Sequence, residues 1–168
     1  MTAIVIDTNV LLVADGRSGM ISNCQVECVE RLEKVRETEQ VVLDYGRLIL
    51  GEYHNKLEPN GRPTPGNAFL KWLLQTQGRS VSWVTITPTT GDNKKFEQFP
   101  ADAKLEEAFD PDDRKFVAAA NAHNPRTSIL QGSDSKWLEW EKSLASHGII
   151  LEVLCRAELE GVRMRKSS

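Results

Sequence analysis

The chain has 168 residues, 40% of them hydrophobic and 27% charged, which suits a single globular domain over residues 1–168 with one continuous core. The formal net charge of −3 argues against a strongly basic coat for nonspecific nucleic-acid binding. No apolar run is long enough to span a membrane, and the N-terminus lacks a secretory signal pattern. We therefore expect a cytoplasmic protein that does not bind membranes.

The three cysteines are expected to be reduced core residues. Their number is odd, and Cys24 and Cys28 are one helical turn apart inside an apolar stripe. A zinc site normally needs about four ligands. Neither Cys155 nor any histidine stands at finger-like spacing from the pair, so the sequence disfavours zinc.

The first part of the chain alternates short apolar strands with helices. Residues 3–7 (AIVID) form a β-branched run typical of a buried strand, and residues 8–16 then open like a helix. Residues 22–39 place apolar side chains along one face and charges opposite, which predicts an amphipathic helix. A second strand over 41–44 and a helix over 46–57 follow. This alternation favours a parallel sheet covered by helices.

The rest of the chain repeats this alternation. The segment 59–66 contains three prolines and two glycines and is predicted to be a loop, and the polar segment 88–104 is predicted to be a long surface loop. Further helices are expected at 67–77, 110–123 and 136–146, further strands at 81–87, 127–130 and 149–154, and a short helix at the C-terminus. The predicted fold is α/β, with three α/β/α layers around a central, mainly parallel sheet of about five strands.

Four carboxylates stand where such a fold usually binds its ligand. Asp7 and Asp134 follow predicted strands, Glu52 lies on the helix after the second strand, and Asp113 lies in the first turn of a helix, where the macrodipole should lower its pKa. Open α/β sheets bind ligands beyond the carboxyl ends of their strands. Four converging acids repel one another unless a hard cation such as Mg²⁺ or Mn²⁺ joins them. The pattern therefore predicts a metal site suited to phosphoryl chemistry.

Four motifs in a fixed order carry a resemblance to a known family. They are VIDTN at 5–9, LGEY at 50–53, DPDDRKFVAAA at 110–120 and SILQGSDSKW at 128–137. Together they resemble the PIN-domain family, over residues 3 to about 154. The acidic positions of the family fall on the same four carboxylates.

The resemblance implies a metal-dependent endoribonuclease, in which Mg²⁺ or Mn²⁺ positions and deprotonates a water that attacks phosphorus in line. The products would carry 5′-phosphate and 3′-hydroxyl ends. Asp7 would be the central metal ligand, Asp113 and Asp134 would complete the site, and Glu52 would bind a second metal or orient water. The expected hydrogen-bond partners behind these ligands are Thr8, Asn9 and Ser133.

The resemblance also suggests a biological setting and partners. The protein would be the toxin or effector of a toxin-antitoxin pair or a defence module. Its candidate partners are an RNA substrate, an inhibitory antitoxin-like protein and a second copy of the chain.

Each of the four acids also has an ordinary structural alternative. Asp7 could cap the following helix, Asp113 could belong to a capping box, Glu52 could be an exposed helix residue, and Asp134 could be a turn aspartate. We favour metal binding for each of them.

Nearby charged residues receive other assignments. Asp44 and Asp110 are expected to cap helices, and Asp112 is expected to be solvated. Arg114 and Lys115 are either phosphate contacts or ordinary surface charges.

Two other functions compete with the nuclease. A haloacid-dehalogenase-like phosphatase also places an aspartate after its first strand and an acidic motif, here GSDS at 132–135, after a late one. That family requires a second acid two residues after its nucleophile, where this chain has Asn9, and no phosphate-binding lysine is evident. The other alternative is a catalytically silent PIN-fold binding module, and the presence of all four acids argues against it.

Overall fold

The computed structural model describes residues 1–17 and 22–167. Its centre is one all-parallel, five-stranded sheet with the strand order β3-β2-β1-β4-β5. The strands are β1 (Thr2–Ile6), β2 (Glu39–Asp44), β3 (Val81–Val84), β4 (Ser128–Gln131) and β5 (Leu151–Val153). The predicted α/β fold is confirmed, and the sheet is parallel throughout.

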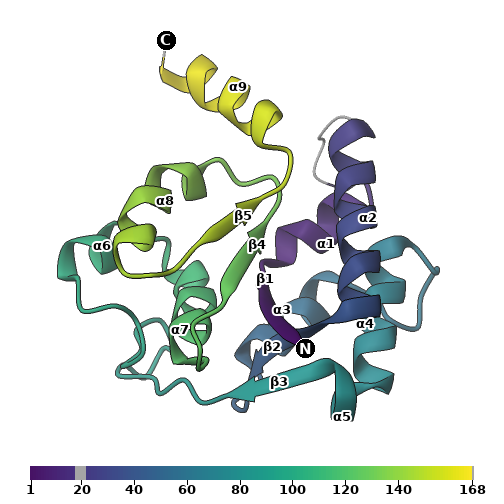
Figure 1. The fold of residues 1–168 in the computed structure, drawn as a ribbon, viewed down its shortest axis with the longest axis horizontal. Helices are drawn as coiled ribbons and strands as arrows, with labels where there is room; N and C mark the ends of the chain where they lie inside the picture. Colours follow the sequence, from purple (N-terminus) through teal and green to yellow (C-terminus); the bar gives the residue numbers. More distant parts are fainter. Residues whose placement is uncertain (18–21, 168) are drawn as a thin grey trace.

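Helices cover both faces of this sheet. Figure 1 shows α6, α7 and α8 on one side and α1, α2 and α4 on the other, so the fold has three layers. The helices are α1 (Thr8–Ala14), α2 (Ser22–Thr38), α3 (Leu48–Lys56), α4 (Pro65–Gln75), α5 (Gln77–Ser80), α6 (Ala103–Ala108), α7 (Arg114–Ala122), α8 (Lys136–Ser146) and α9 (Arg156–Ser167), with a 3-10 turn, η1 (Pro111–Asp113), before α7. None of the helices in the described part of the chain is long and apolar enough to cross a membrane.

The strands consist of continuous apolar residues because both faces of the sheet are buried. Val5 and Ile6 of β1 and Val41 to Leu43 of β2 are fully buried, on both faces of the sheet. A parallel sheet packed by helices on both sides selects such runs instead of alternating polar and apolar residues.

The segment 88–104 differs from the surface loop that its composition predicts. Phe96 and Phe99 within it are buried, and Phe99 packs edge-to-face on Phe109 with 5.7 Å between ring centroids. The segment is polar on average, but these two side chains anchor it to the core. The prediction of a surface loop therefore holds for most of the segment, and composition missed the two buried anchors.

The cysteines also differ from the prediction. Cys24 of α2 and Cys155, which follows β5, form a disulfide with a Cα–Cα distance of 5.0 Å, and Cys28 is a buried free thiol. Burial of all three is confirmed, but the reduced state expected for Cys24 and Cys155 is wrong. The two cysteines are 131 positions apart in the sequence and become neighbours because β5 returns the chain to α2. Arg31 of α2 pairs with Glu152 of β5 at the same junction.

The strand order indicates where this sheet would bind a ligand. From β1 the chain steps to β2 and β3 on one side, and it then crosses back to β4 and β5 on the other. The order therefore reverses between β1 and β4, where open parallel sheets form a crevice. Asp7 directly follows β1 and Asp134 follows β4, so both lie at this reversal.

Candidate metal centre at the carboxyl end of the sheet

Asp7 lies at the middle of this edge. It occupies the N-cap position of α1, but its carboxylate makes no capping hydrogen bond, and it is only 4% exposed. Burial raises the pKa of Asp7 well above its usual range, and the charges of Asp113, Glu52 and Asp134 raise it further. The backbone of Asn9 opposes these effects on the pKa, and the side-chain amide of Asn9 donates a hydrogen bond of 3.1 Å to Asp7 Oδ2. The carboxylate is therefore not occupied by capping, and the other three acids are close enough to act on it.

Glu52 reaches the same edge from α3. The hydroxyl of Thr8 donates a hydrogen bond to Glu52 Oε2, and the ammonium of Lys115 lies 2.8 Å from Glu52 Oε1. Lys115 also donates to the carbonyl oxygen of Asp112. Groups from α1 and α7 therefore orient Glu52. An exposed residue on a helix surface would lack such contacts.

Asp113 joins the cluster from the turn before α7. It stands at the N-cap of α7, yet its carboxylate makes no capping hydrogen bond. Its pKa is raised to about 7, first by burial and then by the charges of Asp110, Asp134 and Glu52, while Lys115 lowers it. The expectation that the helix dipole lowers this pKa is wrong, because desolvation and neighbouring acids outweigh a dipole effect of about 1 kcal/mol.

The loop before Asp134 is tied to Asp7 through Asn9. The Oδ1 atom of Asn9 accepts hydrogen bonds from the backbone N–H groups of Gly132 (3.1 Å) and Ser133 (3.4 Å). The carboxylate of Asp134 accepts one from the backbone N–H of Lys136 at 3.0 Å, as a turn aspartate does. Asn9 therefore bridges the ends of β1 and β4, and Ser133 contributes its backbone N–H to this bridge.

The neighbouring acids have the structural roles expected of them. Asp44 is fully buried and accepts hydrogen bonds from the backbone N–H groups of Leu48 and Ile49, so it caps α3. Asp110 accepts one from the N–H of Asp112, and the carboxylate of Asp112 is exposed and paired with Lys94. The assignments of Asp44 and Asp110 to capping are confirmed.

Arg114 is neither a phosphate contact nor a surface charge. It is 6% exposed, and its guanidinium donates hydrogen bonds to the carbonyl oxygens of Glu106, Lys94 and Phe109. It holds the preceding segment against α7. Of the two candidate cations, only Lys115 faces the acids.

The four acids are close enough for their charges to raise the pKa values of Asp7 and Asp113, but their oxygen atoms are not as close together as the ligands of a bound metal ion would be. In the described part of the chain, only the cysteines place three potential ligand atoms within 4.8 Å of one another. Carboxylates repel one another, and here the half-buried Lys115–Glu52 ion pair and two hydrogen bonds orient them separately. The donors are all hard oxygen atoms, which fits Mg²⁺ or Mn²⁺.

One residue of this site was not singled out in the sequence. The hydroxyl of Tyr53 donates a hydrogen bond of 2.5 Å to the carbonyl oxygen of Ile6, which joins α3 to the end of β1. Burial raises the pKa of Tyr53, and Asp7, Glu52 and Asp44 add to the shift. Its position next to Glu52 in the LGEY motif was the available signal.

The opposite end of the sheet contains a hollow of about 770 Å³, lined in part by Ala3, Arg31, Arg126 and Glu152. It lies away from all four acids.

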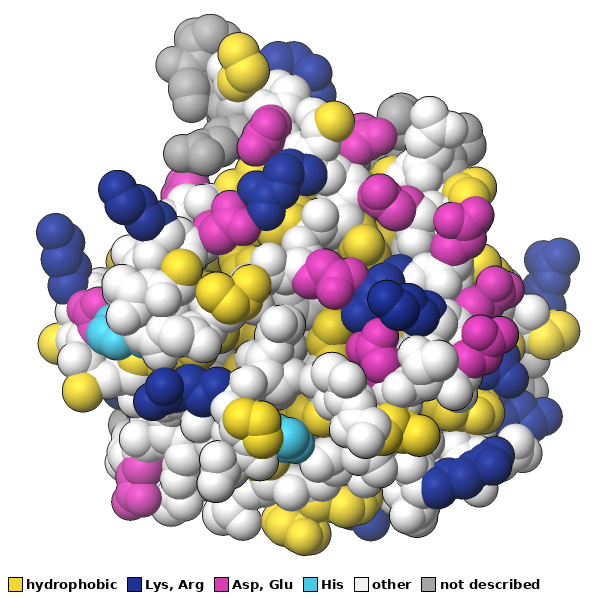
Figure 2. Space-filling view, in the orientation of Figure 1, with side chains coloured by type: hydrophobic (Ala, Val, Ile, Leu, Met, Phe, Trp, Pro, Cys, Tyr) yellow, Lys and Arg dark blue, Asp and Glu magenta, His cyan; other side chains and the backbone are white. Residues whose placement is uncertain are grey.

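The face of the molecule in Figure 2 shows acidic and basic side chains interspersed, with no broad basic surface. This agrees with the small net charge of −3.

No family model matches the chain, and neither a curated protein nor a solved structure matches it. The resemblance to the PIN-domain family therefore stays a prediction that rests on the four motifs.

Proposed function

We propose that the protein is a PIN-like, metal-dependent endoribonuclease that hydrolyses RNA phosphodiester bonds. The observation that carries the proposal is the convergence of Glu52, Asp113 and Asp134 on the buried carboxylate of Asp7, at the point where the strand order reverses. A chain without a cation to bind would gain stability by losing one of these acids, because burying like charges together is unfavourable. Perturbed carboxylates in such a crevice are typical of catalytic sites.

The residues of the chain have distinct roles in this proposal. Asp7, Asp113 and Asp134 would hold Mg²⁺ or Mn²⁺, and Glu52 would hold a second cation or orient water. The bound cation would supply an activated water and stabilise charge on the phosphate. Thr8 and Asn9 keep the carboxylates in place through the hydrogen bonds described above. The Lys115 ammonium, which pairs with Glu52, would contact a phosphate oxygen of the substrate.

Cleavage of labelled single-stranded RNA tests this function. Wild-type protein with Mn²⁺ is expected to leave 5′-phosphate and 3′-hydroxyl ends, and EDTA or the Asp7→Asn substitution is expected to abolish cutting. Asp112→Asn is the matched control, because this exposed acid is paired with Lys94 outside the cluster. Cutting that persists in EDTA, or that Asp7→Asn leaves intact, would contradict the proposal.

The phosphatase alternative makes a different prediction in the same assay. It requires an acid-base group two residues after Asp7, where Asn9 instead uses both ends of its amide to join Asp7 to Gly132 and Ser133. Single-stranded DNA and a generic phosphomonoester should be assayed beside the RNA. Turnover of the phosphomonoester without RNA cleavage would favour the phosphatase.

The toxin or effector role belongs to the same proposal and needs a test in cells. Expression of the wild-type chain without a cognate inhibitor is expected to arrest growth, and expression of Asp7→Asn is not. Equal growth with both would argue against a toxin while leaving the nuclease assay unaffected.

A further inference from the structure

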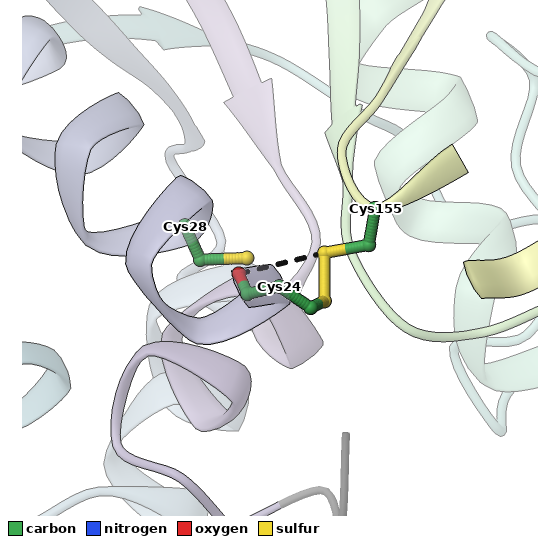
Figure 3. A group of neighbouring side chains, drawn as sticks. All are labelled: Cys24, Cys28 and Cys155. Carbon is green, nitrogen blue, oxygen red and sulfur yellow. Dashed lines mark hydrogen bonds between the residues drawn. A yellow bond between two sulfur atoms is a disulfide. The ribbon is translucent and has the colours of Figure 1, made fainter. Parts of the chain in front are cut away.

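All three cysteines of the chain meet in one buried cluster. Their sulfur atoms lie within 4.8 Å of one another, and the residues are 1%, 0% and 2% exposed in chain order. Cys24 and Cys28 come from one face of α2, and Cys155 comes from the turn between β5 and α9 (Figure 3). This cluster contains none of the carboxylates of the candidate nuclease site.

The disulfide explains only two of these sulfur atoms. Cys24 and Cys155 are bonded to each other, whereas Cys28 is a free thiol directed toward them, as Figure 3 shows. Burial, together with the charge of Glu27, raises the pKa of Cys28 to about 12, so this thiol is not set up to attack the disulfide at neutral pH. A single buried cysteine is an ordinary core residue, but three cysteine sulfur atoms this close together are also the ligand set of a soft-metal site once the disulfide is reduced.

Contacts other than the disulfide also hold the two sides of the cluster together. The backbone N–H of Cys155 donates a hydrogen bond to the Glu27 carboxylate, and Arg31 of α2 pairs with Glu152 of β5. The Sγ of Cys155 also lies 3.5 Å from the carbonyl oxygen of Cys24, which is hydrogen-bonding distance for a thiol. These contacts join α2 to β5 and to the turn that contains Cys155, independently of the S–S bond.

We propose that the reduced protein binds one thiophilic divalent cation, Zn²⁺, through Cys24, Cys28 and Cys155, and that the disulfide and the metal-bound form are alternative states of this cluster. Two equivalents of a thiol reductant convert the disulfide to two cysteine thiols and are themselves oxidised to a disulfide. The cation then displaces three protons as three S–Zn bonds form.

The charges and ligand types suit this cation. Three thiolates and Zn²⁺ leave one net negative charge, whereas three buried thiolates without a cation are strongly unfavourable. Zinc usually takes a fourth ligand, and a carboxylate oxygen is among those that it accepts. Glu27 lies between Cys24 and Cys28 in the sequence, and its carboxylate contacts the backbone of Cys155, so it is the candidate for that position.

Cobalt binding to the full chain tests the inference, because thiolate-to-cobalt charge-transfer absorption reports sulfur ligands and not carboxylates. Reduced, oxygen-free wild-type protein is expected to bind one Co²⁺ with this absorption, and excess Zn²⁺ is expected to displace it. The oxidised protein should show no such absorption. Because the carboxylate site also attracts divalent cations, the titration is repeated in Asp7→Asn, which is expected to retain the whole sulfur signal.

Variants separate metal binding from simple packing. Cys28→Ser and Cys28→Ala keep the disulfide pair, so both can be checked for folding in the oxidised form, and both are expected to weaken metal affinity of the reduced form by roughly 100-fold or more. Glu27→Gln is expected to weaken it by about tenfold. Reduced wild-type protein without charge-transfer absorption, or equal affinity in the Cys28 variants, would overturn the inference. Neither result would bear on RNA cleavage.

Discussion

The protein contains two groups of potential metal ligands, the cysteine cluster and the carboxylates around Asp7. The two groups differ in how closely their side chains approach one another. The sulfur atoms of the cysteine cluster are within 4.8 Å of one another, whereas the carboxylates around Asp7 influence each other electrostatically without that close approach. Two of the sulfur atoms are joined covalently in the disulfide and the third belongs to a neutral thiol, so the cluster packs closely without a counterion. Ionised carboxylates repel one another, which contributes to the raised pKa values of Asp7 and Asp113 and keeps the groups apart until a proton or cation reduces the repulsion. The compactness of a cluster in a ligand-free structure therefore depends on donor chemistry as well as on function.

The largest effect is expected from Asp7→Asn. RNA cleavage should fall by about a thousandfold, because a catalytic metal contributes several kcal/mol of transition-state stabilisation. The same substitution should raise the thermal unfolding temperature at neutral pH in EDTA, since it removes a buried charge surrounded by three acids. Loss of both activity and stability would instead indicate a purely structural Asp7.

The next effect concerns the cysteine cluster. Cys155→Ser removes a disulfide that closes 131 positions of the chain, so the free energy of unfolding should fall by about 3 kcal/mol in urea titrations under oxidising conditions. In a strong reductant the wild type and the variant should differ much less. A large difference that persists there would show that Cys155 acts through packing and not through the disulfide.

The free energy of unfolding should also depend on pH, because Asp113 has different pKa values in the folded and unfolded states. Asp113 has a folded-state pKa raised to about 7, above its unfolded value of about 3.9, so its contribution to stability is fully present below about pH 4 and is lost as the pH rises through 7. We expect a decline on the order of 2 kcal/mol over this window in EDTA. Asp113→Asn should flatten the profile, and an unchanged profile would contradict the assignment.

The smallest expected effect tests the bridge between β1 and β4. Asn9→Ala removes the hydrogen bonds to Asp7, Gly132 and Ser133, so Mn²⁺ affinity should fall by about tenfold in calorimetric titration. Asp112→Asn should leave it unchanged, because Asp112 is exposed. Equal losses in the two variants would mean that general charge, and not the bridge, controls binding.

Features that depend on neighbouring positions could be predicted from the sequence. β-branched runs indicated the strands, helical spacing indicated α2, and the DPDD motif indicated a helix start capped by Asp110. Asp44 as the cap of α3 follows from the same local chemistry. These features are decided within one or two turns of chain, where short-range sterics and hydrogen bonds dominate.

Features that depend on distant neighbours could not be predicted in this way. The pKa of Asp113 rises because the folded chain buries it and brings Asp134 and Glu52 near it, in addition to its close neighbour Asp110. Arg114 is buried because carbonyl groups before α7 surround it. Cys155 meets Cys24 only because β5 lies next to α2. The local sequence pattern thus determined which residues form strands, helices and caps. Tertiary packing alone decided which charges and sulfur atoms lie together, because burial and proximity depend on the folded chain and not on spacing in the sequence.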